Sequence, residues 1–186
     1  METTIQHQTT EQLTDALPFL RAAPRDHGAL KAIVIRPASN ERVSLGHVAL
    51  SPEGGVQGDR WVHSCSKKQP DGSADPDVQV TLMNARMIDL IAGDDSRWAL
   101  AGDNLFVDLD LSNENLKPGD RLAIGTALLE VTSVPHNGCK KFARRFGQDA
   151  VRFVNTPTGK SLHLRGIYAK IVQAGGVTVG DAVDKR

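Results

Sequence analysis

The sequence contains 186 residues, with 22 Lys and Arg residues against 22 Asp and Glu residues, so its formal net charge at pH 7 is zero. A neutral chain of this length predicts one domain with a substantial core, with or without an arm, and argues against general attraction to nucleic acid or to an anionic membrane. Two cysteines, no signal-peptide pattern and no apolar run of membrane-spanning length predict a cytoplasmic protein with free thiols.

The N-terminal part has the pattern of a helix followed by a linker. Residues 9–21 place three leucines on one face, with Thr10 as a candidate N-cap and Pro18 as the point where the helix bends or ends. We therefore expect residues 1–28 to form a helical arm, which packs on the domain or makes a homodimer contact. Residues 29–186 are expected to form the domain itself.

From Leu30 onward the chain consists mainly of short β-type runs separated by Gly and Pro. Strands are expected at residues 32–35, 46–50, 78–82, 104–109, 121–124, 127–134, 162–173 and 177–179. Helices are expected at residues 84–91 and 149–154 and just after Asn137, and residues 67–77 are expected to form a surface loop. Many short strands with few helices predict a mostly β fold, a closed or nearly closed β-barrel with short peripheral helices.

Gly-Asp pairs occur four times, at residues 58–59, 102–103, 119–120 and 180–181. Glycine supplies positive φ and aspartate bonds to nearby backbone, so we interpret all four pairs as turns. Arg60 follows the first pair and a glycine-rich stretch that permits close approach of a ligand. Two roles are open for Arg60: it binds a phosphate or carboxylate through its planar fork, or it pairs with Asp59 or another acid.

The stretch from residue 133 to residue 147 carries chemistry that a generic domain does not need. Pro135 ends the preceding strand, and the turn that follows delivers Cys139 to the first turn of a short helix. Asn137 is the expected N-cap of this helix, and Gly147 is expected to close it in a left-handed conformation.

A thiol in a first helical turn faces unpaired backbone N–H groups and the positive end of the helix dipole, and both favour the thiolate. Lys140 and Lys141 add positive charge beside Cys139. Cations oppose the dipole at a helix start, so we expect a thiolate, a phosphate or a metal oxyanion in front of this helix. The alternative is that Cys139 shares the apolar face of Phe142 and belongs to the core.

Two other constellations use the same cysteine. His63, Cys65, His136 and Cys139 would make a Cys₂His₂ zinc set, although one residue between His63 and Cys65 is tighter than usual zinc-ligand spacing. A Cys–His nucleophile could pair Cys139 with His136, His163 or His63, but no protease signature accompanies it.

Seven short motifs occur in a fixed order. They are Gly58-Asp59-Arg60, Ala101-Gly102-Asp103-Asn104-Leu105, residues 119–125, the Leu-Glu-Val-Thr run at 129–132, Pro135 with Cys139, Leu164-Arg165-Gly166-Ile167, and Gly180-Asp181. Over residues 30–183 this set resembles the MOSC domain, the module named for the C-terminal part of the molybdenum cofactor sulfurase. The resemblance implies a mostly β, barrel-like fold.

The resemblance also implies a molybdenum cofactor, in which the metal is carried by molybdopterin, and a cysteine that ligates molybdenum or handles sulfur. Cys139 matches that cysteine by position, whereas Cys65 matches no motif. Basic and polar residues are implied to hold the cofactor and its phosphate; the candidates are Arg60, Asn104, His136, Asn137, Lys140 and Arg165. Pyridoxal phosphate belongs to a separate domain of fused sulfurases, so none is expected in this chain.

Two classes of function stay open at this point. In the first, the protein is a molybdenum-dependent reductase of N-hydroxylated compounds that takes electrons from an external partner. In the second, it is a carrier: Cys139 receives sulfane sulfur as a persulfide, or holds the cofactor for delivery, and the partner is a molybdopterin or sulfur-donor protein. The residues before Cys139 are Pro135-His136-Asn137-Gly138, which departs from the acidic-arginine approach of related reductases.

Overall fold

The structure is a computed structural model that describes residues 6–186, and residues 1–5 of the predicted arm lie outside the described residues. The helices are α1 (Thr10–Asp15), α2 (Leu17–Arg21), α3 (Trp61–Ser64), α4 (Ala85–Ala92), α5 (Lys140–Phe146), α6 (Gln148–Asn155) and α7 (Pro157–Ser161). The strands are β1 (Gly28–Ile35), β2 (Val43–Leu45), β3 (His47–Ser51), β4 (Gly55–Val56), β5 (Val80–Asn84), β6 (Leu105–Asp108), β7 (Arg121–Ile124), β8 (Ala127–Val131), β9 (Ile167–Gln173), β10 (Gly175–Thr178) and β11 (Ala182–Lys185).

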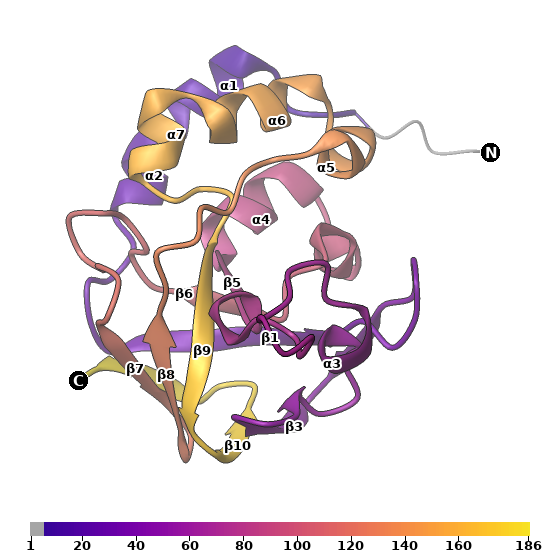
Figure 1. Cartoon of the computed structure of the whole chain (residues 1–186). Helices are drawn as coiled ribbons and strands as arrows, with labels where there is room; N and C mark the ends of the chain where they lie inside the picture. The colour runs from indigo at the N-terminus through magenta and orange to yellow at the C-terminus, as the bar shows by residue number, and fades with distance from the viewer. Residues whose placement is uncertain (1–5) are drawn as a thin grey trace.

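The main sheet closes into a barrel, which confirms the predicted mostly β barrel fold (Figure 1). Its strand order is β11-β7-β8-β9-β5-β6-β1, with β2 added beside β1. Closure comes from β1, which pairs with β6 and also with β11 through Gly28 opposite Val183. The pairs are antiparallel except for β5 and β6, which are parallel and joined through α4. A smaller sheet of β10, β3 and β4 covers one end.

Strand alternation places two cores on opposite sides of the barrel wall. On β6, Leu105 and Val107 belong to the core inside the barrel, whereas Phe106 between them belongs to a core under the helices. Leu82 and Met83 of β5 divide in the same way. Successive side chains of a strand point to opposite faces, so one strand serves both cores. The helices α1, α2 and α4 to α7 cover the second core and gather at one end of the molecule (Figure 1).

The N-terminal arm is part of this helical layer. Its leucine face is buried: Leu13 is 0% exposed and Leu20 is 5% exposed. Thr9, one residue before the predicted cap, accepts a hydrogen bond from the Gln12 N–H and completes a capping box. Pro18 lies in the first turn of α2, so the predicted bend is a break between two helices.

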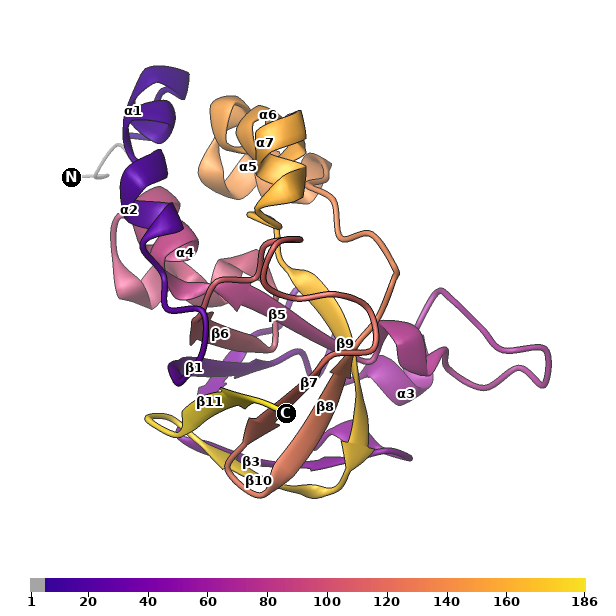
Figure 2. The ribbon, with the colours of Figure 1, turned by 90° about the vertical axis from the view of Figure 1, so that its left-hand side faces the viewer.

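The helix and strand around residues 84–109 match their predictions closely. The Asn84 side chain caps α4 by accepting from the N–H groups of Arg86 and Met87, and Gly93 ends the helix in the left-handed conformation. The following strand, β6, lies inside the predicted residues 104–109. Residues 67–77 form the expected exposed loop, which projects beside α3 in Figure 2.

The strand predicted at residues 162–173 is wrong in its first half. Thr156 caps α7 with Pro157 in the first turn, and the chain then turns through His163, which has φ of 48°, before β9 begins at Ile167. The short strands β2, β4 and β11 were not predicted from the sequence. Within residues 6–186, no helix combines the length and apolar character that crossing a membrane requires.

Candidate active site

The loop from Thr132 to Cys139 leaves the end of β8 and carries Cys139 to α5. Asn155 of α6 holds this loop at both backbone groups of Gly138: its Oδ1 accepts from the Gly138 N–H at 3.0 Å, and its Nδ2 donates to the Gly138 carbonyl at 3.1 Å. Cys139 is itself the N-cap residue, so the helix begins later than predicted, and Asn137 is not its cap. Gly147 has φ of 95° but extended ψ of 161°, so it leads directly into α6 and does not form the predicted left-handed closure.

Cys139 is exposed, which rules out the alternative that it belongs to the core. Its neighbours Lys140 and Arg144 line a shallow groove with it. Within residues 6–186, the four basic residues of α5 form no ion pair with a carboxylate. The thiol therefore lies open to solvent in a basic environment.

Three residues before Cys139, His136 meets a buried ion pair. Arg165 donates from Nη1 to Oδ2 of Asp103 at 2.7 Å, and its Nη2 donates to the Ala101 carbonyl at 3.2 Å. The other Asp103 oxygen, Oδ1, lies 3.7 Å from His136 Nδ1. These two atoms and Arg165 Nε are buried without a hydrogen-bond partner in the described part of the chain. Buried polar atoms are normally paired, so this cluster has unused capacity for water or a ligand.

Burial favours the neutral form of His136. Its side chain is only 9% exposed, and burial lowers its pKa well below the usual value, with Arg165 and Arg36 adding repulsion. Burial raises the pKa of Asp103, while the guanidinium of Arg165 opposes that rise. Arg165 also lies over the Phe142 ring, 4.9 Å from its centroid, which ties this cluster to α5.

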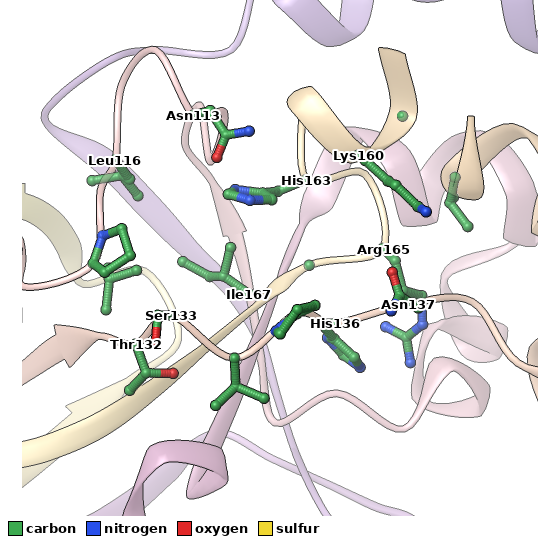
Figure 3. A pocket seen from close by; sticks show the side chains of 17 residues that line it. Asn113, Leu116, Thr132, Ser133, His136, Asn137, Lys160, His163, Arg165 and Ile167 are labelled. Carbon is green, nitrogen blue, oxygen red and sulfur yellow. The ribbon is translucent and has the colours of Figure 1, made fainter. Parts of the chain in front are cut away.

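A cavity of about 410 Å³ opens beside this cluster (Figure 3). Its residues come from the loop after β8, from the segment that joins α7 to β9, and from the segment before β7. They are Asn113, Leu116, Pro118, Val131, Thr132, Ser133, Val134, Pro135, His136, Asn137, Val154, Gly159, Lys160, His163, Arg165, Gly166 and Ile167. Cys139 is not among them, so Asn137 and His136 face the cavity while the thiol lies in the outer groove.

A second buried network joins the end of β1 to the start of β6. Asp59 accepts two side-chain bonds from Arg36, at 2.8 and 3.0 Å, and one from Asn104 Nδ2 at 3.1 Å. Asn104 Oδ1 accepts from Arg36 Nη2 and from the Thr81 N–H and hydroxyl. The amide nitrogen of Asn104, Nδ2, also donates to the Val34 carbonyl. All hydrogen-bonding groups of the Asn104 amide are thus engaged within the protein, and two of its partners are Arg36 and Asp59.

The predicted alternative that Arg60 pairs with Asp59 is wrong, because Arg36 is the partner of Asp59. The interpretation of all four Gly-Asp pairs as turns is confirmed for three of them. Asp59, Asp120 and Asp181 each accept from a nearby backbone N–H group, and Asp59 is also buried and bound to Arg36. Asp103 departs from the prediction, because its buried carboxylate binds the distant Arg165.

Arg60 and Arg36 line a smaller cavity of about 160 Å³, together with Cys65 and Tyr168. The Tyr168 ring packs against His136, with centroids 4.5 Å apart. Tyr168 thus lines the smaller cavity, whereas His136 lines the larger one. Arg60 and Tyr168 line the smaller cavity, and Tyr168 packs on His136, from which the loop leads to Cys139.

The predicted site residues therefore fall into three neighbouring places. His136, Asn137 and Arg165 line the larger cavity, Arg60 lines the smaller one beside the Asn104 network, and Lys140 lies with Cys139 in the groove.

Two other predicted constellations do not form. In the described residues, no three of the predicted zinc ligands His63, Cys65, His136 and Cys139 have ligand atoms within 4.8 Å of one another. No hydrogen bond joins Cys139 to a histidine within residues 6–186, and His163 Nδ1 instead lies 2.6 Å from the Leu111 carbonyl oxygen. The structure therefore shows neither the zinc set nor a preformed Cys–His pair.

Four residues of these clusters were missed as site residues: Arg36, Asp59, Asp103 and Tyr168. Arg36 directly follows the strand predicted at residues 32–35. A cation at the end of a strand was a signal that could have identified it as a site residue. Asp59 and Asp103 belong to the same Gly-Asp dipeptides as Asp120 and Asp181, so the sequence holds no local signal that marks these two as partners of distant arginines.

A family comparison agrees with this architecture. The model of the MOSC domain matches residues 70–184, which is well over half of the chain. The chain belongs to the MOSC domain family. A comparison with curated proteins found no significant match.

Solved structures resemble this MOSC protein over most of its length. The YUAD protein from Bacillus subtilis has a TM-score of 0.56 at 17% identity, covering 85% of this chain and 94% of its own. YiiM from Escherichia coli has a TM-score of 0.53 at 20% identity, covering 85% of this chain and 69% of its own. A structure described as a hypothetical protein has a TM-score of 0.56 at 21% identity, covering 86% of this chain and 68% of its own. At these identities the likeness concerns the fold alone.

Proposed function

We propose that this protein binds a molybdenum cofactor, with the thiolate of Cys139 as a protein ligand of molybdenum. The observation that carries the proposal is the placement of one loop. The loop begins at the buried cluster of His136, Arg165 and Asp103 and ends at an exposed thiol without a hydrogen-bond partner in residues 6–186. MOSC membership supports the same assignment, and Cys139 is the cysteine that the order of sequence motifs matches to the family's cysteine.

The residues present fit such a cofactor by their chemistry. A thiolate is a soft ligand suited to molybdenum in a sulfur-rich environment. The phosphate of the pterin needs fixed cations, and Arg60 and Lys140 are available because neither is engaged by a carboxylate in the described residues. Two of the five N–H donors of Arg165 are bonded within the protein, to Asp103 and to the Ala101 carbonyl, so Nε and one N–H on each terminal nitrogen remain for a ligand. Asn104 acts indirectly by holding Arg36 in place.

When bound, the cofactor supplies two-electron redox chemistry at the metal. The chain contributes the thiolate, the positive field of α5, and a neutral imidazole at His136 that can donate or accept one proton. These contributions suit a reductase of small N-hydroxylated compounds, which would need an external electron donor.

The test compares molybdenum and pterin content in proteins purified from one host that makes the cofactor. We expect wild type to carry both, Cys139→Ser to lose molybdenum, and Arg60→Ala to retain about ten- to a hundredfold less cofactor, since one charge-assisted contact contributes about 1.5–3 kcal/mol. Cys65→Ser is the matched thiol control and should keep its metal. Absence of molybdenum and pterin from wild type, even after cofactor is supplied in vitro, would contradict the proposal.

A sulfur carrier is the second candidate, and the open groove around Cys139 favours it, because a donor protein can reach the thiol directly. In this reaction the Cys139 thiolate attacks the outer sulfur of a donor persulfide, forming Cys139–S–SH and releasing the donor's thiolate after proton transfer. Incubation with a cysteine desulfurase and cysteine should then add one sulfur atom to the Cys139 peptide. An unchanged peptide mass would exclude this role for that donor.

A further inference from the structure

The larger cavity has features that the proposed metal site does not use. Its floor is apolar, because the buried side chains of Leu116, Val131 and Ile167 line it. Its polar groups lie around that floor, with His163 and Lys160 on one side and His136 on the other (Figure 3). A volume of about 410 Å³ lies within the range of small-molecule sites, and a mostly apolar wall with a few polar groups is typical of them.

The charge of this lining is one-sided. Its ionisable residues are Lys160, Arg165, His136 and His163, and none of the described residues that line the cavity is Asp or Glu. The charge of Arg165 is offset by Asp103 behind it, whereas Lys160 has no ion-pair partner within residues 6–186. An uncompensated ammonium group beside an apolar floor favours an anion that carries an apolar body.

A second feature points to a ligand rather than to a passive gap. Arg165 is 7% exposed, lines the cavity, and retains a buried Nε donor with no partner in the described part of the chain. His136 Nδ1 is also unpartnered. Gly166 permits this arrangement: its φ is 110°, and a Cβ there would overlap the Leu82 carbonyl oxygen and lie 3.3 Å from His136 Nδ1. The chain thus maintains a close-packed backbone beside unpaired donors.

We propose that this cavity binds a small organic carboxylate with an apolar body, its charge at Lys160 and Arg165 and its body on the Leu116, Val131 and Ile167 floor. Arg165 is already paired with Asp103, so Lys160 is the cation of this lining without an ion-pair partner in the described residues, and one uncompensated charge suits a singly charged carboxylate better than a doubly charged phosphate monoester. Cys139, Arg36 and Arg60 do not line this cavity, whereas His136 and Arg165 are shared with the proposed cofactor site, so the inference is tested on protein without cofactor.

The experiment uses full-length protein from a host that cannot make molybdenum cofactor, with benzoate as the probe and amide NMR shifts as the readout. Benzoate should shift the amides of residues 159–167 and 136–137 saturably. Benzamide, its neutral counterpart, and benzamidine, its cationic counterpart, should bind at least tenfold more weakly, and phenyl phosphate should bind no more tightly than benzoate. Lys160→Ala should weaken benzoate binding about ten- to a hundredfold. Lys31→Ala removes an exposed lysine on β1 and serves as the matched control.

Any of four results would overturn the inference: no saturable benzoate shift at tens of millimolar, equal binding of benzamide or benzamidine, tighter binding of phenyl phosphate, or a Lys160→Ala affinity equal to that of Lys31→Ala. Because the protein carries no cofactor in this experiment, failure here is separate from failure of the molybdenum proposal.

Discussion

Arg165 and Asp103 form an ion pair of 2.7 Å in which the side chains are 8% and 0% exposed. Removing one partner from a buried pair leaves the other charge uncompensated, which typically costs about 3–5 kcal/mol. We therefore expect Asp103→Ala to lower the free energy of unfolding by about that amount in urea titrations. Arg152→Ala, which breaks an exposed pair with Asp149, should change it by no more than about 1 kcal/mol. Similar losses in the two variants would show that the Arg165 pair is not buried in solution.

His136 should make stability depend on pH. Its pKa in the folded state is lowered well below the usual value by burial and by Arg165 and Arg36, so the folded protein keeps it neutral while the unfolded chain takes up a proton below about pH 6.5. Its contribution to stability is thus present above that pH and decreases as the pH falls.

The difference in unfolding free energy between wild type and His136→Asn isolates this contribution. His27 has a raised pKa, from its bond to Asp184, and acts in the opposite direction, but it is common to both proteins and cancels. We expect the wild-type advantage to shrink between pH 7.5 and pH 5.5. A constant difference across that range would show that His136 is not held neutral.

The sequence predicted the barrel and the helix at residues 84–91, because both depend on local signals such as alternation, caps and glycine ends. It could not predict the strand that closes the barrel, since β11 is a short run, Ala182–Lys185, with charged residues and only one fully buried side chain, Val183. It also could not identify the partners of Asp59 and Asp103. Arg36 and Arg165 lie 23 and 62 residues away, and only the barrel brings them together.

The N-terminal arm should contribute substantially to stability. Leu13 is fully buried in the core beneath the helices, so Leu13→Ala should cost about 2–5 kcal/mol. Asp15→Ala, an exposed change on the same helix, should stay within about 0.5 kcal/mol of wild type. Thermal unfolding followed by circular dichroism provides the measurement, and equal midpoints for the two variants would show that the arm is detached in solution.

The Asn155 bonds to Gly138 should hold the cysteine loop in its working position. Asn155→Asp keeps the acceptor for the Gly138 N–H but places a carboxylate oxygen against the Gly138 carbonyl, where Nδ2 donates in the native protein. We expect a loss of about 1–3 kcal/mol in unfolding free energy and reduced molybdenum retention. Metal content would be measured at a temperature where the variant is fully folded, and retention equal to wild type under those conditions would show that the loop needs no clamp.

The bond between Cys139 and molybdenum is the central claim, and X-ray absorption at the molybdenum edge measures it directly. Full-length wild type and Cys139→Ser would each be reconstituted with molybdenum cofactor, and the sulfur neighbours of the metal counted. We predict one more sulfur neighbour in wild type than in Cys139→Ser. An equal sulfur count in the two proteins, with cofactor bound in both, would contradict the assignment of Cys139 as the metal ligand.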